Sequence, residues 1–244
     1  IREKVLISFE KAERMDNTQD AAKFLNFIII GAGPTGVEMA GAIAEIAHKT
    51  LFKNFKKIRP EESKIYLIEG LPRVLPPFPP KLSARAKKDL ESMGVKVLLE
   101  KMVTNVTDTG VQIGDEFIEA RNIIWAAGNQ ASPILKTLNV PLDRQGRAIV
   151  ESDLSVPRYP EIFVIGDAAC SIGKDGNPLP AVAPTAIQQG RYVAKIIKKQ
   201  VEKEKRLPFK YRDKGSIATI GEYKAVGFIR KMTFSGFFAW LLWG

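Results

Sequence analysis

The sequence is poor in the residues that build disulfides and most metal sites. Its 244 residues include a single cysteine, Cys170, and a single histidine, His48. One cysteine excludes an intrachain disulfide and a metal site made of cysteines, and one histidine excludes a histidine pair on a metal. We therefore predict no metal site, and expect Cys170 to pack as a small apolar residue. His48 should lie on a helix surface or pack against a neighbour.

The sequence also lacks long apolar runs. We find no segment long and apolar enough to span a membrane, and no signal peptide. With 45% hydrophobic residues the chain can still bury one large core or two small ones. It starts with I-R-E-K-V-L-I, which reads as the middle of a helix, and ends in another apparent helix. We therefore expect it to be a piece of a longer protein.

Acidic residues are scarce near the end of the chain. Residues 191–244 hold 13 Lys+Arg against 4 Asp+Glu and account for most of the net charge of +10. A basic segment beside an apolar one indicates an anionic binding surface. We expect no nucleic-acid partner, because no nucleic-acid-binding module is recognisable.

The terminal stretch F-S-G-F-F-A-W-L-L-W-G predicts a helix with one aromatic face. Residues spaced i, i+3, i+4 and i+7 form that face, namely Phe234, Phe237, Phe238 and Leu241. Trp240 and Trp243 flank it, and Arg230 and Lys231 precede it. Aromatic residues beside basic ones suit a helix in the headgroup region of a membrane. The alternative is a helix docked on the protein's own core or on a dimer partner.

The strongest motif is the stretch F-I-I-I-G-A-G-P-T-G-V-E at residues 27–38. Four apolar residues predict a buried strand, and a helix follows the glycines. In a dinucleotide-binding unit, Gly31 would permit the tight turn and Gly33 would let the backbone approach a pyrophosphate. Gly36 would let the helix pack close to the strand. The alternative is a strand-to-helix turn that binds nothing.

A second strand, at residues 63–70, places an acidic residue where a ribose is bound. Glu69 at its end can accept a hydrogen bond from a ribose 2′-OH and would repel a 2′-phosphate, which favours NAD(H) over NADP(H). Residues 48–62 lengthen the connection to this strand. Arg73 keeps NADP(H) open as a minor option, and a solvated acid at a strand end is the alternative.

The middle of the chain reads as short strands, with Gly114 and Asp115 turning a hairpin. A strand at 123–125 ends in small residues that allow a ligand close approach. Residues 162–165 predict another buried strand, followed by a tight turn that carries Asp167. A carboxylate at that position can bind a ribitol or ribose hydroxyl. Residues 180–200 then read as a loop that runs into a helix, with Gln188 and Gln189 in its first turns.

These motifs carry a resemblance. G-A-G-P-T-G-V-E, the strand ending in Glu69, W-A-A-G, V-I-G-D-A-A and A-P-T-A-I-Q-Q-G stand in the order seen in flavoproteins with two dinucleotide-binding domains. With its F-x-A-W-L-L-W ending, the chain resembles type II NADH dehydrogenases, the single-subunit NADH:quinone oxidoreductases. The resemblance implies an α/β fold with a Rossmann-like NAD-binding domain inserted in an FAD-binding domain, which is incomplete here. A membrane-associating helical tail would follow.

The resemblance also implies domain limits. Residues 1–22 would end the first FAD segment, 23–130 would bind NAD(H), 131–200 would form the second FAD segment, and 201–244 would face the membrane. Because the first FAD segment is missing, residues 131–200 should form an incomplete sheet with an unpaired strand edge.

Roles for single residues follow from the same resemblance, with FAD and NAD(H) as cofactors. The NADH pyrophosphate site would comprise Gly31, Gly33, Pro34, Thr35 and Gly36. Glu69 would hold the adenosine ribose, with Ala127 and Gly128 near the same cofactor. Gly166 and Asp167 would hold the FAD ribitol, and the segment from Ala183 and Pro184 to Gln188 would border the flavin and the quinone pocket.

Two residues are candidates for catalysis. Glu38 stands where the family has a carboxylate near nicotinamide and flavin, and could handle the proton of quinone reduction. The alternative is stabilisation of the first helical turn through the helix dipole. Many family members have Ala-Gln where Ala183-Pro184 stands here. Proline has no amide to offer a quinone carbonyl, so Gln188 is the better candidate.

The implied function is hydride transfer from NADH to flavin and electron transfer to a membrane quinone in a respiratory chain, without proton pumping. The protein would lie on the cytoplasmic face of a bacterial inner membrane, attached to its anionic surface through residues 201–244, and a homodimer stays open. The alternatives are a soluble ferredoxin- or rubredoxin-type reductase and a non-catalytic nucleotide-binding module at the membrane. A disulfide reductase is disfavoured, because that class uses a C-terminal histidine.

Overall fold

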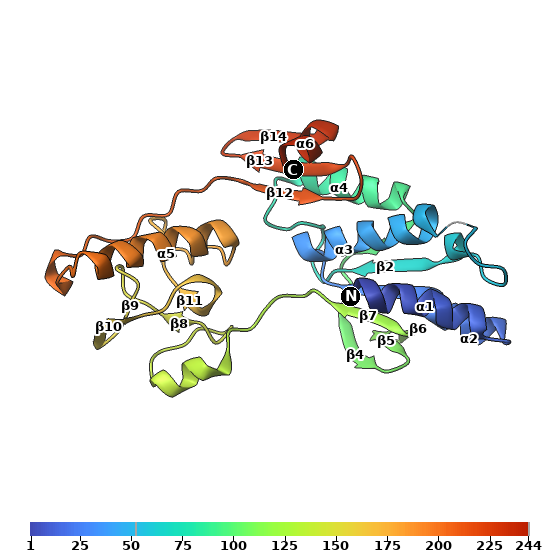
Figure 1. Ribbon diagram of the computed structural model, residues 1–244, viewed down its shortest axis with the longest axis horizontal. Coiled ribbons are helices and arrows are strands. Elements are labelled where there is room, and N and C mark those ends of the chain that lie inside the picture. Colours follow the sequence, from blue (N-terminus) through green and yellow to red (C-terminus); the bar gives the residue numbers. More distant parts are fainter. Residues whose placement is uncertain (52, 244) are drawn as a thin grey trace. The chain divides into compact units, whose positions relative to one another are not determined.

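The computed structural model describes residues 1–51 and 53–243 (Figure 1). They form two compact units. Unit 1 comprises residues 1–128 and 215–244, and unit 2 comprises residues 129–214.

A parallel sheet forms the centre of unit 1. Its strand order is β3-β2-β1-β7. The strands are β1 (Asn26–Ile30), β2 (Lys64–Ile68), β3 (Val95–Leu98) and β7 (Asn122–Trp125). The predicted strand before the glycine loop is confirmed, and its apolar residues are buried because both faces of the sheet are covered.

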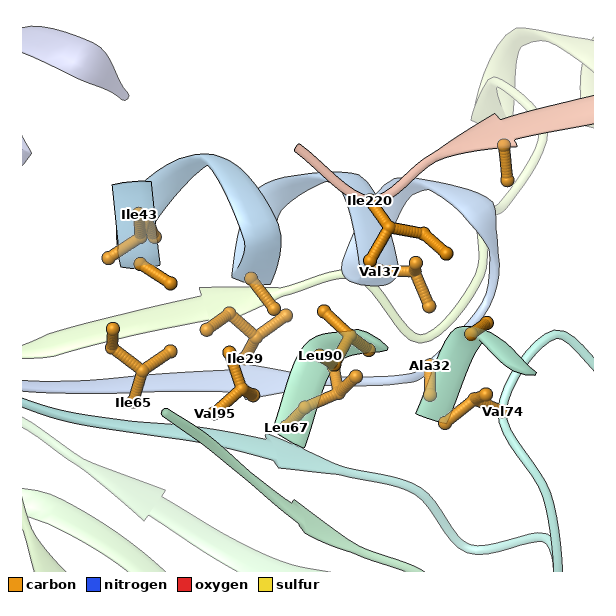
Figure 2. Close-up of a cluster of buried hydrophobic side chains, with 14 of the residues drawn as sticks. Ile29, Ala32, Val37, Ile43, Ile65, Leu67, Val74, Leu90, Val95 and Ile220 are labelled. Carbon is orange, nitrogen blue, oxygen red and sulfur yellow. The ribbon is translucent and has the colours of Figure 1, made fainter. Parts of the chain in front are cut away.

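Helices cover one face of this sheet. They are α1 (Arg2–Arg14), α2 (Thr18–Leu25), α3 (Pro34–Glu45) and α4 (Pro80–Ser92), with a π-helical turn at Ile46–Thr50 and a 3-10 turn at Pro60–Glu62. Figure 2 shows the resulting core, in which Ile29 and Leu67 of the sheet lie beneath Val37 of α3.

A three-stranded antiparallel sheet covers the opposite face. It comprises β4 (Val103–Thr107), β5 (Gly110–Ile113) and β6 (Glu116–Glu119). The predicted hairpin is confirmed, because Gly114 takes a φ of +56° between β5 and β6. Val111 and Ile118 of this sheet pack on Ile28 and Ile30 of β1.

The chain returns to unit 1 at its end and adds another layer outside α3 and α4 (Figure 1). This layer is a sheet of β12 (Ser216–Thr219), β13 (Ala225–Ile229) and β14 (Met232–Gly236), followed by α6 (Phe237–Trp243). Gly41 of α3 lies so close to Ile220, the residue that follows β12, that an added Cβ would be 2.7 Å from the Ile220 carbonyl oxygen.

The prediction of a helical face that begins at Phe234 is wrong. Phe234 lies in β14 and pairs with Gly227, and the helix begins only at Phe237. Gly236, with a φ of +78°, ends the strand. The side chain of Trp243, which was expected to flank the face, lies outside the described residues. No helix in the described part of the chain has the length and apolarity needed to cross a membrane.

Unit 2 is built on the helix α5 (Ala183–Lys198), as predicted. The strands β8 (Ala148–Ile149), β9 (Ser155–Val156), β10 (Tyr159–Phe163) and β11 (Ala169–Cys170) pair only in twos, β9 with β10 and β8 with β11. The 3-10 turns are Pro133–Leu138, Gly166–Ala168 and Lys203–Lys205. Leu142 forms a further isolated bridge to Ala148 of β8. The described strands of unit 2 thus form two short ladders and no continuous sheet, in line with the incomplete sheet expected for this region.

The strand before Gly166 differs from its prediction. Strand β10 ends at Phe163, and its side chains are exposed or half-buried instead of buried, because it pairs only with β9. The apolar run extends beyond the strand to Val164, which is buried, and Ile165, which is exposed.

The two units divide the chain differently from the domains expected from the resemblance. No boundary lies near residue 22, because Val5, Phe9 and Ala12 of α1 pack into the same core as the parallel sheet. Residues 201–214 belong to unit 2, and residues 215–244 belong to unit 1.

Candidate functional site

The glycine loop between β1 and α3 is shaped by backbone contacts that a side chain would prevent. Gly31 has a φ of +98°, and an added Cβ would lie 2.7 Å from the backbone of Ala127. At Gly36 an added Cβ would lie 1.8 Å from the Gly31 carbonyl oxygen. At Gly33 no atom lies within 4 Å of that position. Gly31 and Gly36 are therefore required by the fold, whereas Gly33 leaves room for a ligand.

The start of α3 offers unpaired donors beside this room. Gly33 is the N-cap and Pro34 occupies the first turn, and the described side chains make no cap hydrogen bond there. The backbone N–H groups of Thr35 and Gly36 belong to the first turn, which has no intrahelical acceptors. Free N–H groups and the positive end of the helix dipole suit a phosphate group.

Glu69 lies directly across this loop. One carboxylate oxygen accepts a hydrogen bond from the Ala32 N–H at 2.7 Å, and the other accepts one from the Leu71 N–H at 3.0 Å. The carboxylate thus ties the end of β2 to the glycine loop. Each oxygen has a second lone pair that a ribose hydroxyl can use.

A cavity of about 510 Å³ lies at the ends of these strands. Its walls include Gly31, Gly33, Glu69, Ala127 and Gly128, which brings together five residues that were predicted from different motifs. Arg73 instead donates a hydrogen bond to the Pro76 carbonyl at 2.7 Å. It is not among the described residues that line the cavity.

The cavity also has apolar walls that sequence reasoning did not assign to it. Trp125 and Met102 line it and are 62% and 69% exposed. Trp125 is the register partner of Ile30, the residue before the glycine loop. The signal in the sequence was its position immediately before Ala126-Ala127-Gly128.

The structure places Glu38 on α3 but not in this cavity. Its carboxylate is half-buried and accepts a hydrogen bond from the Thr219 N–H of β12 at 3.3 Å. Seven residues along α3, Glu45 accepts one from the Glu222 N–H at 2.6 Å. Both carboxylates therefore hold the C-terminal sheet on α3.

In unit 2, Asp167 lies on the exposed 3-10 turn that follows β10. Gly166, which precedes it, has a φ of +66°, and an added Cβ would meet the Cβ of Ala186 at 3.3 Å. The turn is thus packed against the first turns of α5, where Ala183 and Pro184 lie.

The two adjacent glutamines of α5 have different surroundings. Gln188 donates to the Arg212 carbonyl and accepts from the Arg212 N–H, both at 3.0 Å. Gln189 is 1% exposed and contacts Gly166 and Ser171. The side chain expected to face a quinone therefore clamps a backbone segment, and sequence reasoning gave no role to Gln189.

Three ionisable side chains outside these sites are held by packing or by hydrogen bonds within the protein. Burial raises the pKa of the Cys170 thiol, which fits the predicted packing role. His48 packs against Gly94 and contacts the Met93 carbonyl through Nδ1 at 2.9 Å, as a packing residue would. Burial alone would raise the pKa of Asp153. Hydrogen bonds from Ser155, Arg206 and Lys203 outweigh it and lower that pKa.

The sequence matches the family described as pyridine nucleotide-disulphide oxidoreductase over residues 2–190. The chain belongs to this family. It is 43% identical over 255 residues to the type II NADH:quinone oxidoreductase Ndh of Mycobacterium tuberculosis. That alignment covers 100% of this chain and 54% of the relative. The chain therefore spans about half the length of the curated relatives it matches.

Solved structures support the fold. NDH2 from Plasmodium falciparum in complex with NADH matches with a TM-score of 0.88 at 21% identity, over 100% of this chain and 65% of that chain. The ferredoxin reductase for the CYP199A2 system from Rhodopseudomonas palustris matches with a TM-score of 0.61 at 18% identity, over 84% and 53%. At these identities the likeness shows the pyridine nucleotide-disulphide oxidoreductase fold alone.

Proposed function

We propose that the protein containing this chain oxidises NADH and reduces a membrane quinone through FAD. The observation that carries this proposal is the cavity of about 510 Å³ in which the glycine loop, Glu69 and Gly128 meet. The Mycobacterium tuberculosis relative, 43% identical to this chain, is named a type II NADH:quinone oxidoreductase. In balance, NADH, a proton and a quinone would give NAD⁺ and a quinol.

The shape of the glycine loop supports the proposal that a dinucleotide binds in this cavity. Gly33 leaves space where a Cβ would otherwise stand, and the first-turn N–H groups of α3 would bind the pyrophosphate. Glu69 would accept the adenosine ribose hydroxyls and disfavour a 2′-phosphate. NADH is therefore the expected donor, and the Arg73 contact with Pro76 argues against a 2′-phosphate site at that residue.

The turn of Gly166 and Asp167 fits the ribitol of FAD. Its carboxylate is exposed, and the turn lies beside the start of α5, where Pro184 and Ala183 would border the flavin. When bound, FAD supplies the acceptor for the hydride and the donor of two electrons to the quinone. The residues of this chain would bind and orient it and exclude water.

Glu38 in unit 1 and Gln188 in unit 2 are the proposed catalytic residues. Glu38 would hydrogen-bond the nicotinamide or hold the proton that quinone reduction consumes, and the Thr219 N–H would fix its carboxylate. Gln188 would have to exchange its contact with Arg212 for one with the quinone. This makes Glu38 the stronger of the two candidates.

Attachment to a membrane surface is the proposed means of reaching the quinone. Phe237, Phe238, Leu241 and Leu242 of α6 are all more than half exposed. Exposed aromatic and aliphatic side chains near Arg230 and Lys231 suit the interface of an anionic bilayer. The protein would then be a peripheral protein on the cytoplasmic face of a bacterial inner membrane. In a homodimer, the exposed side chains of α6 would instead contact the second copy of the chain.

A soluble ferredoxin-type reductase is the alternative, favoured by the structural match to a ferredoxin reductase. The exposed apolar face of α6 would have no purpose in such a protein. A non-catalytic nucleotide-binding module is the alternative for the chain by itself.

The test is NADH oxidation by the parent protein with FAD. A short-chain quinone is compared with an oxidised iron–sulfur protein as acceptor, and NADPH replaces NADH in a control. Fast turnover with quinone and NADH supports the proposal. Turnover with the iron–sulfur protein but not with the quinone would contradict the proposal and support a ferredoxin-type reductase.

A further inference from the structure

Gln189 lies in the second turn of α5 and is 1% exposed. Its amide makes two hydrogen bonds to one small region. Oε1 accepts from the Gly166 N–H at 2.7 Å, and Nε2 donates to the Ser171 Oγ at 2.8 Å. The two partners flank the turn that carries Asp167.

Both the oxygen and the nitrogen of this amide therefore have a partner, in a place where an unpaired amide would be unfavourable. A buried amide that lost its partners would forfeit its hydration without compensation. The Gly166 N–H requires an acceptor, whereas the Ser171 hydroxyl can accept from an amide or donate to a carboxylate. A glutamine pairs with both partners through one side chain.

The bond to Gly166 constrains the residue that follows it. Gly166 has a φ of +66°, in the left-handed region that favours glycine, and the adjoining Asp167 is exposed. Fixing the Gly166 N–H fixes the peptide between Ile165 and Gly166, at the start of the turn that carries the Asp167 side chain. The neighbouring Gln188 cannot share this task, because its amide is paired with Arg212.

We propose that Gln189 is a positioning residue of the flavin site. Its side chain holds the Gly166 turn so that Asp167 faces the ribitol hydroxyls. This inference rests on the proposed function, since it assumes that Asp167 binds FAD. Gln189 itself would not touch the cofactor. It restricts the turn before FAD arrives, which reduces the ordering that binding would otherwise require.

The test is FAD affinity of the deflavinated parent protein, measured by quenching of flavin fluorescence. Gln189→Met keeps the side-chain length and removes both hydrogen bonds. It should weaken FAD binding about tenfold, because the turn must then be ordered when FAD binds. Gln189→Glu keeps an acceptor for the Gly166 N–H and should restore most of the affinity. Tyr192→Phe is the matched control, because it removes one hydrogen bond from α5 to the Leu207 carbonyl, away from the turn.

A thermodynamic cycle separates positioning from general stability. If Gln189 acts through Asp167, Gln189→Met should weaken FAD binding much less in an Asp167→Asn background. If Gln189→Met and Tyr192→Phe lower the melting temperature equally and neither changes FAD affinity, Gln189 is structural only and the inference is overturned. If the unaltered parent protein takes up no FAD, the proposed function fails first.

Discussion

Gly33 and Gly36 occupy the same loop but have different surroundings, so one substitution should have two outcomes. Gly36→Ala places a Cβ against the Gly31 carbonyl and should destabilise the chain by about 1–3 kcal/mol and abolish NADH binding. Gly33→Ala places a Cβ in open space and should leave stability unchanged while it weakens NADH binding. Denaturant unfolding and NADH titration of the chain check both.

Equal loss of stability in the two variants would contradict this prediction. Unchanged NADH binding by Gly33→Ala would show that the open space at Gly33 is not where the pyrophosphate lies.

Asp153 is the residue through which we expect unit 2 to respond to acid. Its folded pKa is lowered, so its contribution is complete above its unfolded pKa of about 3.9 and is lost as the pH falls through the folded value. Asp153→Asn should destabilise unit 2 by about 1–3 kcal/mol at neutral pH, because it weakens hydrogen bonds to charged groups.

The measurement is the melting temperature from neutral pH down to pH of about 3. The difference between the unaltered chain and Asp153→Asn should shrink below pH of about 4. Glu161→Gln, an exposed carboxylate of the same unit, is the control and should show a smaller difference. A gap that persists undiminished in acid would rule out the charge of Asp153 as its source.

The contrast between Gln188 and Gln189 shows what a sequence can and cannot tell at this scale. The helix that carries them was predicted from the sequence, and the glycine loop and Glu69 were predicted from their motif. Adjacent residues on a helix point about 100° apart, and the packing of the whole helix decides which one is buried. The local sequence around Q-Q does not determine that rotation, so it could not show that Gln189 is the buried one of the two amides.

At the scale of elements, the docking of α3 on β12 should be sensitive to a single methyl group. Gly41→Ala directs a Cβ to within 2.7 Å of the Ile220 carbonyl and should destabilise unit 1 by about 1–3 kcal/mol. Gly190→Ala in α5 is the matched control, since its Cβ would meet only the Ile165 Cδ1 at 3.7 Å. It should stabilise unit 2 by about 0.5–1 kcal/mol through helix propensity.

We expect chemical denaturation to show a lower free energy of unfolding for Gly41→Ala and a higher one for Gly190→Ala. Stabilisation by both would mean that β12 does not pack on α3 as described.

The C-terminal sheet shows why some elements escaped prediction. Spacing at i, i+3, i+4 and i+7 made Phe234 part of a helix, yet the same residue alternates correctly for β14. The β13–β14 turn has Arg230 at a φ of +54° without glycine or asparagine there, so the usual hairpin signal is missing. Short apolar runs remain ambiguous between helix and strand until long-range pairing decides.

At the scale of the whole molecule, the exposed side chains of α6 should govern attachment to membranes. Replacing Phe238 and Leu241, which are 75% and 59% exposed, by serine should weaken binding to anionic vesicles at least tenfold, since each buried apolar side chain contributes about 1.5–3 kcal/mol. Ile134→Ser, in unit 2 and 67% exposed, is the control and should have little effect. Cosedimentation of the chain with vesicles measures the difference.

If the chain with serine at positions 238 and 241 still sediments with vesicles as the unaltered chain does, the basic residues of the chain, and not α6, would account for attachment.

Unit 1 is assembled from the two ends of the chain, and this affects the order in which it can fold during synthesis. Glu38 and Thr219 are 181 residues apart in sequence, and Glu45 and Glu222 are 177 apart. When the ribosome has made the glycine loop and α3, the strand that covers α3 does not yet exist. The outer face of α3, with Gly41 and its two carboxylates, must stay uncovered until unit 2 has been made. Stalled or shortened translation products would expose this face, and it is there that we expect chaperones to bind the nascent chain.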